Sequence, residues 1–181
     1  MKIFAETGRF ILRELLLSDD KGIFELDSNH DVHKYLGKKP IKNIEEARKV
    51  IDFIRQQYVD NGIGRWAIIE KATSKFAGWT GLKLVREKIN NHSDFYDLGY
   101  RLIPKFWGKG IATETAKACV SYGFDRLNLD CIYGMADIDN KTSIHVLQKA
   151  GLEFIETFDY DGTEHAWLSI LNRKVWQTTS N

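Results

Sequence analysis

A glycine-rich turn at residues 107–113 has residue types and spacing suited to binding an anionic group. Gly108 and Gly110 let the backbone approach a pyrophosphate because neither carries a Cβ, and Ala112 keeps the following turn narrow. The turn stands between an expected strand and an expected helix, whose first N–H groups lack partners within the helix. Lys109 adds a positive charge. The pattern indicates a phosphate site, and a glycine-rich turn without a ligand is the alternative.

Three kinds of phosphate loop compete for this turn. A P-loop requires Gly, four residues, Gly, Lys and then Ser or Thr, but Lys109 lies between the two glycines. A Rossmann fingerprint requires Gly or Ala where this chain has Thr113, and an acid at the end of the next strand, whereas Asp130 stands at that strand's beginning. A coenzyme A pyrophosphate loop remains, with a Rossmann-like dinucleotide binder as the rival.

The length and composition bound what the rest of the chain can be. With 181 residues, 43% of them hydrophobic, the chain has the size and the apolar material of one packed domain, expected over residues 1–181. A formal net charge of +1 gives no global field for nucleic acid or an acidic membrane, and no apolar run reaches the roughly 20 residues of a membrane span. The N-terminus has no apolar secretory stretch, so we expect a cytoplasmic protein. We expect a monomer or a homodimer.

Hydrophobic periodicity and turn residues predict the elements that position the turn. In chain order we expect a strand at 9–15, a short helix between 18–20 and 28–31, a helix at 44–60 capped by Asn43, a hairpin of 65–70 and 75–85, a strand at 95–103, a helix at 110–126, a strand at 130–136, a helix from the cap at Asp139 and Asn140 to Lys149, and strands at 152–159 and 164–171. This order favours an α/β fold whose mixed sheet is antiparallel at the start, with parallel elements around the two later helices.

Two segments of the sequence resemble motifs of the GNAT superfamily of N-acetyltransferases. Residues 97–114 resemble motif A, and residues 140–152 are similar to the second motif, in which Asn is followed three residues later by Ala or Ser and then by Lys-x-Gly-Phe. With an opening Arg9-x-x-Leu-Arg and two closing strands, the resemblance covers about residues 9–171. The Gly99-Tyr100 pair and Ser143 look most like the RimJ/RimL type, the ribosomal-protein N-terminal acetyltransferases and their relatives.

The resemblance implies a mixed, mostly antiparallel sheet flanked by helices, and acetyl transfer from acetyl-CoA to a primary amine, foremost a protein or peptide N-terminal α-amine. A small amine acceptor (polyamine, amino acid or antibiotic) and a non-catalytic acyl-CoA-binding module are the alternatives. Leu102 and Ile103 would hold the pantetheine arm through their backbones and Asn140 through its side chain. Helix capping is the alternative role of Asn140, and the two roles can coexist. The implied CoA-binding residues are Arg101, Leu102, Ile103, Trp107, Gly108, Lys109, Gly110, Ile111, Ala112, Thr113, Asn140 and Ser143.

The catalytic residues also follow from the resemblance. Asp97 stands where the family often has Glu and is the candidate base, acting directly or through water, although a solvent-exposed aspartate at a strand edge is an equal alternative. Leu147 occupies the position where many members have the Tyr that protonates the thiolate. Ser143 is the implied substitute, Tyr100 is a weaker one, and a small residue on a packed helix face is the alternative role for Ser143. A backbone N–H near residues 100–102 would bind the oxyanion.

The remaining chemistry-bearing side chains are aromatic, thiol or imidazole groups. Tyr35, Trp66 and Trp79 are candidates for the acceptor pocket, Trp79 because its strand should neighbour that of Asp97, but aromatic residues are more often core. Cys119 lies on an apolar helix stripe and is expected in the core rather than as a nucleophile. It is expected to stay reduced. The five histidines show no zinc-ligand spacing, so no metal is expected.

Overall fold

The computed structural model describes residues 1–37 and 39–172, so residues 38 and 173–181 of the expected domain lie outside the description. The described elements are β1 (Ile3–Glu6), β2 (Phe10–Arg13), a 3-10 helix η1 (Leu17–Asp19), α1 (Asp20–Asp27), α2 (Ile44–Asn61), β3 (Arg65–Glu70), β4 (Phe76–Val85), β5 (Phe95–Leu102), a 3-10 helix η2 (Pro104–Phe106), α3 (Ile111–Asp125), β6 (Cys131–Asp137), α4 (Lys141–Lys149), β7 (Glu153–Tyr160) and β8 (Thr163–Leu171). The expected helices and the later strands are confirmed, with ends displaced by one or two residues.

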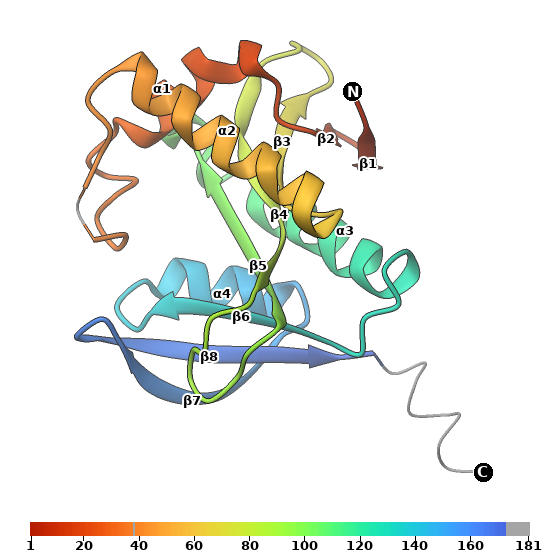
Figure 1. The fold of residues 1–181 in the computed structure, drawn as a ribbon, viewed down its shortest axis with the longest axis vertical. Coiled ribbons are helices and arrows are strands. Elements are labelled where there is room, and N and C mark those ends of the chain that lie inside the picture. Colours follow the sequence, from red (N-terminus) through yellow and green to blue (C-terminus); the bar gives the residue numbers. More distant parts are fainter. Residues whose placement is uncertain (38, 173–181) are drawn as a thin grey trace.

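The strands form one mixed sheet in the order β1-β2-β3-β4-β5-β6-β8-β7 (Figure 1). Among the neighbouring pairs of the described strands only β5 and β6 are parallel, so the prediction of a mostly antiparallel sheet is confirmed. β7 runs parallel to β6 with β8 between them, which agrees with parallel elements around α3 and α4. A Rossmann-like dinucleotide binder is wrong, because that fold requires a mostly parallel sheet.

The sequence prediction missed the first strand. β2 is the strand expected over residues 9–15, and the unpredicted β1 precedes it. In the turn that joins them, the Thr7 N–H donates to the Phe10 carbonyl (2.9 Å) and the Phe10 N–H donates to the Thr7 hydroxyl (3.0 Å). β1 is only four residues long, too short for a periodic signal. Its Phe4 ring stacks on Trp66 at 4.7 Å, so tertiary packing holds this strand in place.

Both faces of the sheet are covered by helices, and the alternation of side chains along β3 separates two cores. Ala67 packs with Ile51 on the face covered by α1 and α2. Trp66 and Ile68 point the other way, into the core that includes Cys119 of α3. Figure 1 shows α2 lying across the sheet on one side and α3 on the other. The site therefore rests on a sheet held rigid from both sides.

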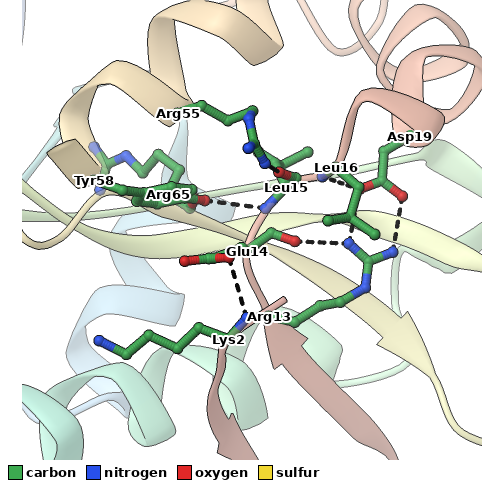
Figure 2. A network of polar contacts seen from close by, with 9 residues as sticks. All are labelled: Lys2, Arg13, Glu14, Leu15, Leu16, Asp19, Arg55, Tyr58 and Arg65. Carbon is green, nitrogen blue, oxygen red and sulfur yellow. Dashed lines mark hydrogen bonds and ion pairs between the residues drawn. The ribbon is translucent and has the colours of Figure 1, made fainter.

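A polar network ties the N-terminal strands to the start of β3 (Figure 2). Arg13 donates two hydrogen bonds to the Asp19 carboxylate, each of 2.8 Å, and both side chains are nearly buried. The Tyr58 hydroxyl accepts from the Leu15 N–H (3.1 Å) and donates to the Arg65 carbonyl. Burial raises the pKa of Tyr58 to about 12, so its hydroxyl stays protonated and keeps this donor role. The network fixes the backbone from which the Arg65 side chain extends.

Candidate active site

The glycine-rich turn lies between β5 and the N-terminus of α3, as predicted. Gly108 and Gly110 have φ values of +70° and +72°, in the left-handed region that glycine adopts without a Cβ clash. No side chain caps the N-terminus of α3, and the Glu114 N–H closes the first turn on the Gly110 carbonyl at 3.0 Å. The backbone N–H groups of residues 111–113 come before this first helical bond, so they have no partner within the helix. An uncapped helix N-terminus of this kind can receive a phosphate.

Side chains from distant parts of the chain hold this turn. The Arg9 guanidinium donates to the Lys109 carbonyl (3.1 Å) and to the Glu114 carboxylate (2.7 Å). The Trp107 indole N–H donates to the Leu102 carbonyl (2.8 Å), so this predicted loop residue links the turn back to β5. Arg9 was part of the opening motif but was not predicted to reach the turn. Its contact spans 100 residues and depends on how β2 is placed beside α3.

Beyond the turn, β5 and β6 separate. The parallel ladder between β5 and β6 has a single register pair, Asp97 with Tyr133. The ladder between β4 and β5, in contrast, extends over the whole length of β5. Figure 1 shows the two strands running in clearly different directions. A pocket of about 840 Å³ opens here. The predicted site residues that line it are Tyr35, Trp79, Asp97, Tyr100, Arg101, Asn140 and Ser143.

Asp97, the candidate base, is buried at 7% exposure and is not the solvent-exposed strand-edge aspartate of the alternative interpretation. Its Oδ2 accepts a hydrogen bond from Nη2 of Arg65. The two side chains form an ion pair in which both are about nine-tenths buried. Arg65 was missed in the sequence, because no local pattern pairs residues 32 positions apart on different strands. The sheet register brings them together across β4.

The thiolate-donor candidates, Tyr100 and Ser143, contact each other. The Tyr100 hydroxyl is 2.7 Å from the Ser143 carbonyl, to which it donates, and 2.8 Å from the Ser143 hydroxyl. Burial raises the pKa of Tyr100 well above its ordinary value, and the nearby Asp97 charge raises it further. Asn140 caps α4 by accepting the Ser143 N–H at 3.1 Å, which confirms the capping interpretation and fixes the serine backbone. Tyr100 and Ser143 thus form one hydroxyl pair at the pocket wall.

The aromatic candidates divide into pocket and core. Two guanidinium groups lie near the Trp79 ring, that of Arg65 at 5.4 Å and that of Arg101 at 5.1 Å from the ring centroid. Trp79 lines the pocket with Tyr35. Trp66 is fully buried against Phe4 on the helix α3 side, so its assignment to the acceptor pocket is wrong. Trp66 and Trp79 sit on adjacent antiparallel strands, and the register of those strands sends their side chains to different environments.

The three residues at or just after the end of β5 that were predicted to contact the cofactor have different surroundings in the structure. The Ile103 N–H donates to the Ala77 carbonyl at 3.0 Å, which commits it to β4 and removes it as a donor for pantetheine. Backbone groups of alternate residues face opposite neighbours, so the Leu102 N–H points away from β4, while the Leu102 carbonyl accepts the Trp107 indole N–H. The Arg101 side chain does not reach the turn, because it pairs with Asp27 of α1 at 2.6 Å. Leu102 therefore remains the candidate backbone contact.

The thiols are placed as expected. Cys119 and Cys131 are both free. Cys119 has no exposed surface, and burial raises its pKa to about 12, so no thiolate is present to act as a nucleophile. Over residues 1–37 and 39–172, no group of three His, Cys, Asp or Glu side chains is arranged to hold a metal ion. Within the same residues no helix combines the length and the apolar character needed to cross a bilayer.

Comparison with known proteins places this geometry in a family. The model of the acetyltransferase (GNAT) domain matches residues 9–153. The chain is 32% identical over 148 residues to the uncharacterised N-acetyltransferase YoaA of Bacillus subtilis (strain 168), covering 82% of this chain and 81% of the relative. It is 29% identical over 140 residues to the spermidine N(1)-acetyltransferase of Escherichia coli (strain K12), covering 77% and 70%. RimL, a ribosomal L7/L12 α-N-protein acetyltransferase solved with coenzyme A, has a TM-score of 0.79 at 18% identity, covering 94% and 98%.

The chain belongs to the GNAT acetyltransferase family, and it is an N-acetyltransferase. The structural similarity to RimL, at its low identity, shows the shared fold and does not define the RimJ/RimL type.

Proposed function

We propose that the protein transfers the acetyl group of acetyl-CoA to a primary amine, foremost the α-amine of a protein or peptide N-terminus. One observation carries the proposal. The separation of β5 from β6 opens a pocket that Asp97 lines from one strand and Ser143 from the helix that follows the other strand, while the uncapped α3 begins after the same strand β5. A turn suited to a pyrophosphate, a carboxylate and a hydroxyl pair are groups that acetyl transfer from a thioester can use.

The residues of the turn fit a pyrophosphate. A Cβ added at Gly108 would meet no neighbour within 4 Å, so the backbone there faces open space. The N–H groups at the start of α3 lie at the positive end of the helix dipole. The Arg9 guanidinium lies beside Gly110 and adds a positive charge. The turn and Leu102 would hold the cofactor, which supplies the acetyl thioester when it is bound. This chain's own residues would then orient the acceptor and manage its proton.

Asp97 and the hydroxyl pair have different tasks in this proposal. Asp97 accepts an amine proton, directly or through water, as the neutral amine attacks. A free α-amine has a pKa near 8 and is about one-tenth neutral at pH 7, so modest base assistance suffices. Ser143 donates its hydroxyl proton toward the departing sulfur, and Tyr100 donates to Ser143. These roles keep both side chains in the chemical step and leave cofactor affinity to the turn.

A peptide α-amine as acceptor is supported by the similarity of Gly99-Tyr100 and Ser143 to the RimJ/RimL type. A small polycationic amine is the second candidate. Asp137, Asp139 and Asp161 line the same pocket, and the Escherichia coli relative is named for spermidine. Carboxylates at the pocket wall would attract additional ammonium groups of such a molecule.

Thiol release from acetyl-CoA, followed by mass spectrometry of the acceptor, tests the proposal. The panel contains lysine-free peptides with varied first residues, the same peptides with a blocked N-terminus as matched controls, and spermidine. Acetylation of the free peptides alone supports the α-amine. Acetylation of small amines alone contradicts it and supports the second candidate. The cytoplasmic location and the monomer or homodimer state are further predictions, tested by cell fractionation and light scattering.

A further inference from the structure

Arg65, the first residue of β3, bonds directly to the carboxylate that the proposed reaction uses. Its side chain is 11% exposed. Nη2 donates to Asp97 Oδ2, while Nη1 donates to the carbonyls of Gly81 (2.5 Å) and Asp97 (2.8 Å). The guanidinium thus bridges three adjacent strands, β3, β4 and β5. Because these donors are fixed in one plane, the position of the carboxylate oxygen is fixed with them.

The surroundings of the guanidinium confine it further. A Cβ added at Gly99 would lie 2.6 Å from Nη2 of Arg65, so the absence of a side chain at this position leaves the space that the guanidinium occupies. The Trp79 ring lies 5.4 Å from the guanidinium carbon, at a distance typical of a cation–π contact. Arg65 cannot leave this position without giving up two buried carbonyl acceptors. It is therefore held as rigidly as the sheet itself.

The same geometry leaves one oxygen of Asp97 uncommitted. Arg65 takes Oδ2, and among the described residues Oδ1 accepts no hydrogen bond, while Asp97 lines the pocket. We propose that Arg65 is a positioning residue that orients Asp97 so that Oδ1 alone is presented to the acceptor amine. This inference rests on the proposed function, because an acceptor for Oδ1 exists only if an amine enters this pocket.

Arg65 contributes both a direction and a charge. The guanidinium places a positive charge next to the carboxylate, and its planar fork fixes the direction of that contact. The other titratable groups near Asp97 are its register partners Lys83 on β4 and Tyr133 on β6, together with Tyr100 on its own strand. None of these makes a hydrogen bond to the Asp97 carboxylate among the described residues. Replacing Arg65 should therefore remove the contact that fixes the carboxylate.

Two substitutions separate the direction from the charge. Arg65→Lys keeps a cation but replaces the planar guanidinium fork by one ammonium, which does not impose the same fixed geometry on its acceptors. Arg65→Gln removes the charge. Arg48→Gln is the matched control, because Arg48 is half exposed and pairs with Asp20 away from the pocket. Circular dichroism and the acetyl-CoA thermal shift confirm that each variant is folded and binds cofactor.

The first measurement needs no acetyl transfer. Crystal structures of the wild type and the variants show the orientation of the Asp97 carboxylate. We expect the carboxylate to keep its orientation in Arg48→Gln and to rotate in Arg65→Gln, which loses the donor to Oδ2. An unchanged carboxylate orientation in a folded Arg65→Gln would overturn the inference. This result stands even if the wild type acetylates none of the amines tested, in which case the proposed function alone fails.

The second measurement uses the verified acceptor. Arg65→Lys should lower kcat about 10- to 100-fold with the KM for acetyl-CoA nearly unchanged, because misdirection of a base affects the chemical step. If Arg65 acts through Asp97, adding Arg65→Lys to Asp97→Asn should change kcat by less than about twofold. Wild-type kcat in Arg65→Lys, or a full additive loss in the double variant, would show that Arg65 does not work by orienting Asp97.

Discussion

Removing the Ser143 hydroxyl by Ser143→Ala should slow acetyl transfer about 10- to 30-fold without weakening acetyl-CoA binding. In the proposed reaction this hydroxyl donates to the departing sulfur, and a hydrogen bond to a charged group contributes about 1.5–3 kcal/mol. A thiolate of pKa near 8.5 leaves tolerably without a proton donor, so the loss should fall at the low end, about 1.4–2 kcal/mol.

The Tyr100→Phe substitution tests the pair. The Tyr100 hydroxyl has one proton and two acceptors, the Ser143 carbonyl at 2.7 Å and the Ser143 hydroxyl oxygen at 2.8 Å. As Ser143 donates to sulfur, the tyrosine proton can turn to the serine oxygen, a neutral hydrogen bond that contributes about 0.5–1.5 kcal/mol. Tyr100→Phe should therefore slow the reaction about 2- to 10-fold. The double variant should be no more than about twofold slower than Ser143→Ala alone, because Tyr100 reaches the sulfur only through Ser143.

The effect of Tyr100→Phe should also be the same from about pH 6 to pH 9. Burial raises the pKa of Tyr100, so the phenol loses its proton only above the ordinary range. Through the assay range the hydroxyl is protonated and remains a donor. A Tyr100→Phe effect that disappears as the pH rises through this range would mean that the phenol titrates there and that the assigned donor role is wrong.

Single-turnover kinetics with a verified amine measures these effects free of product release. Tyr122→Phe and Ser121→Ala serve as matched controls, because Tyr122 packs against Phe4 and Trp66 and Ser121 is exposed on α3, both outside the pocket lining. Additive losses in the double variant would refute the coupling of the pair. Wild-type rates in both single variants would leave protonation of the thiolate to solvent.

Other expected outcomes concern the turn, the N-terminal network and the thiol. Gly110→Val should abolish the acetyl-CoA thermal shift in a folded protein, because the φ of +72° at this position disfavours valine. The added Cβ itself would meet nothing closer than 3.8 Å. Lys109→Ala should weaken acetyl-CoA binding less. Asp19→Asn should destabilise the protein by about 3 kcal/mol because it leaves the nearly buried Arg13 without its counter-charge, while Asp20→Asn, in a more exposed pair, should cost below about 1 kcal/mol in urea unfolding. Cys119, with a pKa of about 12, should be alkylated by iodoacetamide at about pH 8 only after unfolding.

Each of these outcomes has a clear opposite. Unchanged acetyl-CoA affinity in a folded Gly110→Val would remove the assignment of the turn. Equal unfolding free energies for Asp19→Asn and Asp20→Asn would mean that burial of the Arg13 pair adds nothing. Rapid labelling of Cys119 in the native protein would show that α3 opens away from the sheet.

The sequence by itself determined the helices and the later strands, with their ends to within one or two residues, because these depend on neighbouring residues. Asn43 accepts the Glu46 N–H at 3.0 Å and Asn140 accepts the Ser143 N–H, contacts that lie three residues apart and follow from residue type. The glycines of the turn were equally readable, since only their backbone freedom is required. Hydrophobic periodicity predicted α2 and α3 to within one or two residues.

The tertiary structure decided which side chains meet. The Arg65–Asp97 pair crosses 32 residues and forms because the sheet register aligns β3, β4 and β5. The Tyr100–Ser143 pair crosses 43 residues and forms because the fold brings the start of α4 to Tyr100 on β5. The tertiary structure also placed Trp66 in the core and not in the pocket. Its residue type is compatible with the pocket or the core, and a strand's alternation decides between them only after the sheet has acquired its register and its covering helices.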